Sequence, residues 1–387
     1  MNIRQRYLAT VLASGVLAGC LVPACLFLAA KPFGASETLA ALADRQAKAP
    51  ETVFLPFDLR YNGAFKLDRV RQMRPDVLCI SSSRAGTLAA PMFAPYRFYN
   101  MSFTAWTTEQ IADMFERATR NSPPRVAIIS IDYFLFTEDW ERGYSGTRTQ
   151  IYGHPWNYLK SSIADFVRTY AKRPQVFRDY LKSPTPFIGT QSILGGEGFR
   201  SDGSYVYSSG HIADSQLHNL TAAMLVNSMP GAPAMSERQK EPLARMARLA
   251  QQRGIKLIGV QLPYIRAGVN YLDHNEAYRH YSGVWREFES EQTRAWLKSL
   301  GITFFDLARS TIDDDNQNFV DAYHTSELGS LRVMQQLLTL PEFRAILPDI
   351  DPAATARQIE EIERPSRTST SSSDLSGSGA HEPRRDP

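Results

Sequence analysis

A short apolar run that ends in three serines is the feature that most constrains the fold of this chain. Residues 77–80 are all apolar, and Ser81, Ser82 and Ser83 follow them directly. The run is too short for a helix, and an unbroken apolar run is typical of a central parallel strand, whose two faces are both covered by helices. Ligands of open α/β sheets bind at the carboxyl ends of the strands. The serines are therefore predicted to lie where chemistry would occur, although serines at such a point also commonly cap a helix.

Strand-like and helix-like segments alternate over most of the chain. The other predicted strands are short apolar runs at 98–103, 126–132, 256–262 and 302–307. Segments with the apolar spacing of amphipathic helices lie between and after them, at 107–118, 242–252, 285–297 and 328–338. Strands separated by helices imply crossover connections and a parallel sheet. The predicted fold is α/β, with a doubly wound, mostly parallel sheet between two helical layers, as in flavodoxin-like proteins.

Changes of composition predict the domain boundaries. The α/β domain is expected over residues 56–348, with an aromatic-rich helical insertion at 138–236 after the third strand. Residues 31–55 are polar and alanine-rich and are interpreted as a linker. Residues 349–387 are predicted to be a disordered tail, because their Ser-, Gly- and Pro-rich end cannot bury enough apolar surface to fold.

The N-terminus has the composition of a membrane anchor. The basic segment MNIRQR precedes an uncharged run at 7–30, and about 20 apolar residues suffice to cross a bilayer as a helix. Positive charge before the run predicts residues 1–6 in the cytoplasm of a bacterium and the catalytic domain on the far side of the inner membrane, in the periplasm. Two alternatives stay open: a lipoprotein anchored at Cys20, or cleavage after Ala30 as a signal peptide.

Charge and cysteine usage exclude several classes of function. The chain has 387 residues, with 43 Lys and Arg against 40 Asp and Glu, so it lacks the basic excess of a nucleic-acid-binding protein. The three cysteines, Cys20, Cys25 and Cys79, do not have the spacing of a metal site. The sequence therefore predicts no nucleic-acid partner, no metal and no cofactor.

A second chemical signal is the segment VDAYHTSELG, in which Asp321 and His324 lie three residues apart before the last predicted helix. A serine nucleophile needs a positioned base, and a carboxylate can hold a histidine in the tautomer that this role requires. The alternative is a loop aspartate that binds backbone amides beside an exposed histidine. A one-residue change in where the first strand ends would exchange Ser82 and Ser83 as the presented hydroxyl.

The insertion contains one loop with a composition suited to a polar ligand. Residues 195–211 are glycine-rich and carry Arg200, Asp202, Tyr205 and His211. Binding loops favour such residues, but so do plain surface loops. Arg200 and Asp202 are candidate substrate-binding residues.

Together, the strand with its serine turn and the Asp-x-x-His segment resemble the SGNH, or GDSL-type, hydrolase superfamily. More narrowly, they resemble its membrane-anchored periplasmic branch, found beside polysaccharide O-acetylation systems. The resemblance implies that Ser83 is the nucleophile, because the first family block falls on Ser81-Ser82-Ser83. It also implies that His324 is the base, that Asp321 orients it, and that Arg84 follows the nucleophile as in the branch that reads Gly-Ser-Ser-Arg; Arg84 is a further candidate for substrate binding.

The oxyanion-binding blocks match the family less well. The resemblance implies backbone N–H donors at Ser83 and at Ala105, which stands in the place of the second-block glycine. The asparagine of the third block is missing, and Asp132 or Tyr133 occupies its place. An ionised Asp132 would repel an oxyanion, whereas Tyr133 could donate to it. Loss of one such donor costs roughly 10²–10³ in rate.

The resemblance implies a serine-dependent O-acyltransferase or esterase that acts on a cell-envelope polysaccharide, with a multi-span membrane acyltransferase as a possible partner and acyl donor. A hydrolase with water as the acceptor fits the same residues. The alternative is an inactive relative that binds glycan or acts as a scaffold in a membrane complex, which the missing asparagine favours.

Overall fold

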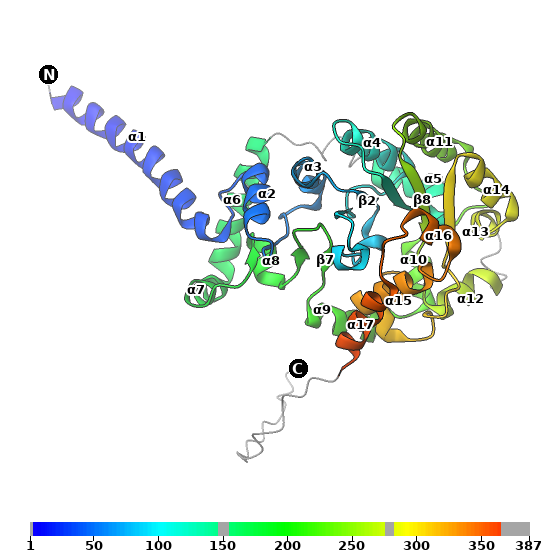
Figure 1. Cartoon of the computed structure of the whole chain (residues 1–387). Helices are drawn as coiled ribbons and strands as arrows, with labels where there is room; N and C mark the ends of the chain where they lie inside the picture. The colour runs from blue at the N-terminus through cyan, green and yellow to red at the C-terminus, as the bar shows by residue number, and fades with distance from the viewer. Residues whose placement is uncertain (1–2, 146–154, 275–281, 365–387) are drawn as a thin grey trace, which may run out of the picture.

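The computed structural model describes residues 3–145, 155–274 and 282–364 (Figure 1). Its largest sheet has five strands in the order β3-β2-β4-β8-β9, and each neighbouring pair is parallel. The strands coincide with the five apolar runs of the sequence and are β2 (Val77–Ile80), β3 (Phe98–Met101), β4 (Val126–Ser130), β8 (Lys256–Gln261) and β9 (Ile302–Asp306).

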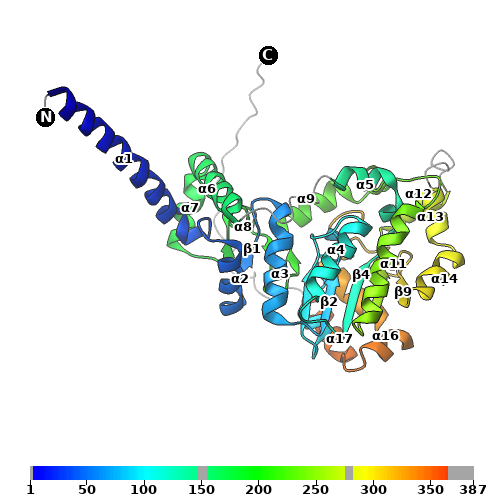
Figure 2. The ribbon, with the colours of Figure 1, turned by 90° about the horizontal axis from the view of Figure 1, so that it is seen from above.

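Helices cover both faces of this sheet, and successive residues of each strand point to opposite faces. Leu78 and Ile80 pack on one side with α3 (Asn62–Met73), α4 (Thr108–Thr119), α11 (Glu237–Gln252), α13 (Gly283–Phe288) and α14 (Glu291–Ser299). Val77 and Cys79 pack on the other side with α15 (Glu327–Leu337), α16 (Pro341–Ile346) and α17 (Pro352–Glu363). Figure 2 shows the sheet between these two layers.

The strand order places a crevice at the carboxyl ends of β2 and β4. The chain passes from β2 outward to β3 and then returns to β4 on the opposite side of β2. Connections that leave neighbouring strands in opposite directions create the point at which open α/β sheets bind ligands. The serine turn after β2 lies at this point.

A second, mixed sheet of four short strands was not expected from the sequence. Its order is β5-β1-β6-β7, with β1 parallel to β5 and antiparallel to β6. The strands are β1 (Val53–Phe54), β5 (Phe187–Ile188), β6 (Gly198–Phe199) and β7 (Tyr205–Val206). Strands of two residues leave no periodic pattern in a sequence, which is why the insertion was interpreted as helical.

Residues 31–55, interpreted as a linker, are folded into this part of the molecule. They form η1 (Lys31–Phe33), α2 (Leu39–Lys48) and β1, the last of which pairs with two strands of the insertion. The ring of Phe33 lies 5.2 Å from that of Phe166 and 5.0 Å from that of Phe177. These two rings come from α6 (Pro155–Lys172) and α7 (Pro174–Lys182), so the insertion packs on the N-terminal segment rather than standing alone.

The prediction of a membrane anchor is corrected by the structure. A helix, α1 (Ile3–Ala30), extends away from the body (Figure 1). Among the described residues, however, no helix is both long and apolar enough to cross a membrane. The expected transmembrane segment and the inner-membrane location that depended on it are therefore not supported.

The remaining helices complete the two layers and the insertion. The segment predicted as one helix at 285–297 is divided into α13 and α14, because Ser290 caps the second helix by accepting a hydrogen bond from the N–H of Thr293. Helix α17 lies within the predicted tail and buries Thr355 and Ile359. The other helices are α5 (Glu138–Ser145), α8 (Thr190–Gly195), α9 (Ser209–Asn219), α10 (Ala222–Ser228) and α12 (Arg266–His274).

Candidate active site

The turn after β2 leaves one of its three serines available for chemistry. Ser83 begins the short 3-10 turn η3 (Ser83–Ala85). The Oγ of Ser82 accepts a hydrogen bond from the N–H of Arg84 at 3.4 Å, and the Oγ of Ser81 accepts one from the N–H of Ala85 at 3.3 Å. Both of these hydroxyls therefore accept hydrogen bonds from the backbone of the turn, whereas the Oγ of Ser83 makes its contact outside the turn.

An unbroken hydrogen-bonded chain joins Ser83, His324 and Asp321. The Oγ of Ser83 lies 2.7 Å from Nε2 of His324, and Nδ1 of His324 lies 2.7 Å from Oδ2 of Asp321. With its proton on Nδ1, the imidazole donates to Asp321 and accepts the proton of the Ser83 hydroxyl. This is the arrangement of a nucleophile, a base and an orienting carboxylate.

Asp321 is held as an anion in a short loop before α15. Its Oδ1 accepts hydrogen bonds from the N–H groups of Tyr323 and His324, each at 2.9 Å. Burial alone would raise the pKa of Asp321, but the charge and hydrogen bond of His324 and the two backbone donors outweigh it, so the pKa lies below its ordinary value. The same segment therefore supplies the base, its orienting carboxylate and the donors that keep that carboxylate ionised.

Buried hydroxyls connect the histidine loop to the nucleophile turn. Thr87, four residues after Ser83, donates to the carbonyl of Thr325 at 3.1 Å and lies 2.7 Å from the Oγ of Ser330. The N–H of Val320 donates to the carbonyl of His324 at 2.8 Å, which closes the loop on itself. These contacts fix the distance between two segments that are far apart in the sequence.

The segment expected to bind the oxyanion lies against the nucleophile turn. The N–H of Phe103 donates to the carbonyl of Ser82 at 3.1 Å, and the N–H of Thr104 donates to that of Ser81 at 3.4 Å. Within the described part of the chain, the N–H groups of Ser83 and Ala105 donate to no other group. Both predicted backbone donors therefore lack a hydrogen-bond partner among the described residues, and Ala105 is fully buried.

Phe103 adopts an unusual backbone conformation to make this contact. Its φ is +60°, in the left-handed region that bulky residues rarely occupy. A Cβ on Gly86 would lie 2.9 Å from Cε2 of Phe103 and 2.9 Å from the carbonyl oxygen of Ser83. The close approach of the two segments therefore requires glycine at position 86, and such local strain is common at functional sites.

The carboxylate of Asp132, which occupies the place of the missing asparagine, accepts hydrogen bonds from three side chains. Its Oδ1 lies 3.2 Å from Nη2 of Arg84 and accepts a hydrogen bond from the hydroxyl of Tyr264 at 3.0 Å. Its Oδ2 accepts the hydroxyl of Ser130 at 2.9 Å. The expected repulsion between Asp132 and an oxyanion is therefore reduced, because the Arg84 guanidinium lies against the Asp132 carboxylate.

The other candidate donor, Tyr133, directs its hydroxyl to a backbone carbonyl. It is fully buried, its hydroxyl lies 3.5 Å from the carbonyl oxygen of Met229, and its ring packs 5.3 Å from that of Trp285.

Arg84 joins the nucleophile turn to two other strand ends and to the histidine loop. Its side chain is 1% exposed and donates to the carbonyls of Leu262 at 2.5 Å and Pro263 at 3.2 Å, and to that of Tyr323. Its guanidinium carbon lies 3.9 Å from the centre of the Tyr264 ring. Nε has no partner among the described residues. Most of the N–H donors of Arg84 are thus used in hydrogen bonds within the protein.

The two candidate binding residues of the insertion loop also make contacts within the protein. Asp202 accepts hydrogen bonds from the N–H of Ala90 at 2.6 Å and from the N–H of Ser204 at 2.9 Å. Arg200 pairs with Glu327 at 2.9 Å, at the start of α15. The loop passes beside the nucleophile turn, because the N–H of Tyr205 donates to the carbonyl of Gly86 at 2.7 Å.

Aromatic residues surround His324, and sequence reasoning did not identify them. The ring of Tyr323 lies 4.4 Å from that of His324, and the ring of Tyr207 lies 6.4 Å from it. Behind Tyr207, Nδ1 of His211 lies 3.0 Å from Oε2 of Glu197. Both Tyr207 and His211 belong to the glycine-rich loop, but only tertiary packing shows that Tyr207 lies beside His324 and that His211 packs on Tyr207.

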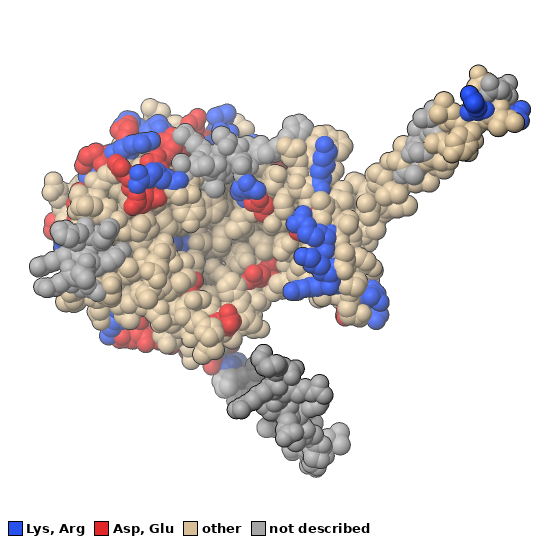
Figure 3. All heavy atoms as spheres, turned by 180° about the vertical axis from the view of Figure 1, so that it is seen from behind, with Lys and Arg blue, Asp and Glu red and all other residues tan. Residues whose placement is uncertain are grey.

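A cavity of about 240 Å³ opens beside Ser83. We call it the aromatic cavity, because five aromatic side chains form much of its wall. It is lined by Ser82, Ser83, Arg84, Trp106, Phe134, Trp140, Tyr144, Ser228, Met229 and Tyr323. On the face opposite to that in Figure 1, acidic and basic side chains are mixed at one end of the body, whereas basic side chains gather beside the base of α1 (Figure 3).

Comparisons with known proteins leave the function to be argued from this geometry. No family model and no curated protein matches the chain. Among solved structures, the chain is similar to a GDSL-like lipase from Bacteroides thetaiotaomicron VPI-5482, at 12% sequence identity and a TM-score of 0.32, over 79% of this chain and 100% of the lipase. A likeness at this level carries no argument about the chemistry of this chain.

Proposed function

We propose that this chain catalyses acyl transfer from an ester through a covalent intermediate on Ser83. The observation that carries the proposal is the chain of two 2.7 Å contacts from Asp321 through His324 to Ser83. A serine hydroxyl is a weak nucleophile without a base, and this histidine is both within reach and oriented by a carboxylate.

The first half of the reaction forms the acyl-enzyme. The Oγ of Ser83 attacks the carbonyl carbon of the ester while its proton passes to Nε2 of His324. The negative charge on the carbonyl oxygen is stabilised by the free N–H groups of Ser83 and Ala105. The bond to the leaving alcohol then breaks, and the proton on His324 passes to the leaving oxygen. Asp321 stabilises the imidazolium that forms between these two steps.

The second half returns the enzyme to its starting state. A water molecule or a second alcohol loses its proton to His324 and attacks the acyl carbon. The bond between that carbon and the Oγ of Ser83 breaks, and the proton returns to the serine. Water as the acceptor gives an esterase, and an alcohol gives an acyltransferase.

The finer part of the proposal is that the acceptor is a hydroxyl of a cell-envelope polysaccharide. Support comes from the aromatic rings of Tyr207 and Tyr323 beside His324, because aromatic faces provide apolar surface on which sugar rings can pack. That a multi-span membrane acyltransferase supplies the acyl group is a proposal that rests on the sequence resemblance alone. Incubation of acyl-labelled protein with envelope polysaccharide fractions, followed by mass analysis of the glycan, would test the acceptor.

Intact mass after treatment with a fluorophosphonate tests the catalytic proposal. We expect one covalent adduct on the parent chain and none on Ser83→Ala, with the labelling rate of His324→Ala reduced by at least about 10³. Ser299→Ala and His218→Ala change exposed residues and should label like the parent. An unlabelled parent, under conditions that label an ordinary serine esterase, would instead favour a binding or scaffold protein.

A further inference from the structure

We propose that Lys66 and Asn62 are positioning residues that hold the N–H of Ala105 where it can bind an oxyanion. The inference rests on the proposed function and adds two residues to its machinery. Both residues lie on α3 and direct their donors at the backbone of the residues that precede Ala105.

One face of α3 carries buried polar side chains. Asn62, Lys66 and Arg69 are spaced four and three positions apart, so they lie on the same face of the helix. All three are buried, and each donates to backbone carbonyls of other segments. A helix face that packs on a core is ordinarily apolar, so polar residues here indicate a specific need for hydrogen-bond donors.

The ammonium group of Lys66 binds three backbone carbonyls. Its Nζ lies 3.0 Å from the carbonyl oxygen of Asn100, 2.8 Å from that of Ser102 and 2.8 Å from that of Gly203. It also lies 4.0 Å from the centre of the Phe199 ring. Three acceptors require the three N–H donors of the charged form, because the neutral amine has only two. The acceptors thereby oppose the effect of burial, which lowers the pKa of Lys66 well below its ordinary value.

The cost of burying an ammonium group indicates that its three hydrogen bonds matter here. An apolar side chain of similar length could fill the same space without loss of hydration, but it could not donate. Two of the three carbonyls belong to residues 100–105, which we call the oxyanion segment because it ends at Ala105. The third, that of Gly203, belongs to the glycine-rich loop of the insertion. Lys66 therefore fastens both segments to α3.

The oxyanion segment is held from two sides. On the α3 side, Nδ2 of Asn62 donates to the carbonyl of Phe103 at 3.2 Å, and Lys66 donates to that of Ser102. On the other side, the N–H of Phe103 donates to the carbonyl of Ser82 at 3.1 Å. The left-handed φ of Phe103, +60°, is unfavourable for a bulky residue and persists only where the surroundings hold it.

The backbone conformation at Phe103 determines where Ala105 lies, because Ala105 follows it by two residues. Without the donors of Lys66 and Asn62, their acceptor carbonyls would lose these partners in a buried place, and the segment would relax. A shift of about 1 Å at a group that positions the reaction can lower the rate about 100-fold. Helix α3 thus acts on the reaction through the backbone of the oxyanion segment.

The rate of fluorophosphonate labelling, measured beside its end point, tests this role. The end point counts the molecules in which Ser83 reacts, so unfolded protein does not contribute to the rate constant. For Lys66→Met we expect full labelling at the end point, with a rate constant about 100-fold below that of the parent, because an oxyanion donor is misplaced. Asn62→Ala removes one donor and should label about tenfold more slowly. It remains informative if Lys66→Met does not fold.

The matched control is Arg69→Met, because Arg69 lies one turn further along the same face of α3. Its guanidinium donates to the carbonyls of Ala43 at 3.4 Å and Ser201 at 3.1 Å, which lie outside the oxyanion segment. Arg69→Met should lower the free energy of unfolding, as Lys66→Met does, but it should label at the parent rate.

The pH profile of labelling separates the oxyanion segment from the nucleophile and its base. The profile reports the ionisation of His324, so its midpoint should be the same in the parent, Lys66→Met and Asn62→Ala. A shifted midpoint would show that α3 acts on His324 instead, and the proposal would be overturned.

The remaining outcomes separate the positioning role from the catalytic proposal. If Lys66→Met and Asn62→Ala both label at the parent rate, or if Arg69→Met slows labelling as much as Lys66→Met, the positioning role is overturned while acyl transfer stands. If Ser83 of the parent is not labelled, the proposed function fails and the positioning role fails with it.

Discussion

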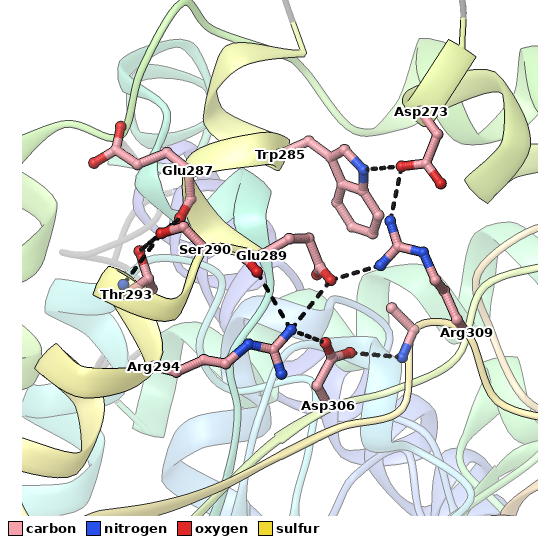
Figure 4. A network of polar contacts seen from close by, with 10 residues as sticks. Asp273, Trp285, Glu287, Glu289, Ser290, Thr293, Arg294, Asp306 and Arg309 are labelled. Atoms are coloured by element: carbon pink, nitrogen blue, oxygen red, sulfur yellow. Dashed lines mark hydrogen bonds and ion pairs between the residues drawn. The ribbon is translucent and has the colours of Figure 1, made fainter.

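Two clusters of arginine and carboxylate side chains lie in the α/β domain, and they differ in how many donors each carboxylate receives. In the cluster beneath Ser83, the single carboxylate of Asp132 receives Arg84 and the hydroxyls of Tyr264 and Ser130. In the second cluster, which we call the Glu289 cluster, Glu289 and Asp306 lie 3.6 and 2.7 Å from the same guanidinium nitrogen of Arg294 (Figure 4).

The Glu289 cluster contains two arginines, Arg294 and Arg309, yet one oxygen of Glu289 still has no hydrogen-bond partner among the described residues. Arg309 lies 2.7 Å from Glu289, but Oε1 of Glu289 has no partner among the described residues. Burial and the neighbouring charge of Asp306 raise the pKa of Glu289 to about 7, although Arg309 opposes this shift. A nearby arginine is therefore not sufficient to keep the pKa of Glu289 at its ordinary value.

The two clusters are linked through aromatic side chains. Trp285 donates to Oδ1 of Asp273 at 2.8 Å, and Arg309 donates to the same oxygen at 2.7 Å (Figure 4). The ring of Trp285 lies 6.2 Å from that of Tyr264, which donates to Asp132. Substitutions in each cluster can therefore be compared within one continuous core.

Removal of Arg84 is expected to have the largest effect. Arg84→Met leaves Asp132 buried with no cation and leaves three backbone carbonyls without their donor, which should lower the free energy of unfolding by about 3–5 kcal/mol. Urea unfolding at neutral pH measures this loss.

The double variant Arg84→Met/Asp132→Asn sharpens the interpretation of that loss. Because it removes the stranded charge together with its partner, it should be more stable than Arg84→Met alone. Equal stabilities would show that the ion pair is not the reason that Arg84 matters. Arg84→Lys keeps a charge and provides a folded alternative if the methionine variant does not fold.

The pH dependence of the free energy of unfolding is expected to report the protonation of Glu289. Its effect should lie between that of removing Arg84 and that of removing Arg309. The folded state binds a proton on Glu289 more tightly than the unfolded state, whose glutamate has its ordinary pKa of about 4.3. This contribution is fully present below pH about 4.3 and is lost as the pH rises through about 7. We expect a loss on the order of 2 kcal/mol between pH 5 and pH 8.

The variant Glu289→Gln isolates this group from other titrating residues. It cannot ionise, so its stability should fall less than that of the parent over the same pH range. Parallel curves for the two proteins, measured by urea unfolding at each pH, would contradict the raised pKa.

Arg309→Met is expected to have the smallest effect. The side chain of Arg309 is 46% exposed, so solvent screens its interactions with Glu289 and Asp273. Exposed ion pairs typically contribute about 0.2–1 kcal/mol, and we expect a loss in this range at neutral pH. A loss as large as that of Arg84→Met would remove the distinction between the two clusters.

Several parts of the fold and the site could be predicted from local patterns. The five strands of the parallel sheet were located because central strands must be apolar on both faces, which produces unbroken apolar runs such as 77–80. The serine turn and the Asp-x-x-His segment were singled out because each contains its reactive residues within a few positions. The membrane anchor was wrong, because an uncharged run alone does not establish a spanning helix.

What the sequence by itself determined is therefore where the strands of the large sheet lie along the chain and which segments carry Ser83 and His324, since both depend on residues close together in the chain. Only the tertiary structure decided that Arg84 balances Asp132, that β1 pairs with β6 across the insertion, and that Trp106 and Trp140 wall a cavity beside Ser83. These contacts join residues from 34 to 145 positions apart, such as Trp140 with Trp106 and Phe54 with Phe199. No local spacing encodes such pairs, because they follow from how whole elements pack.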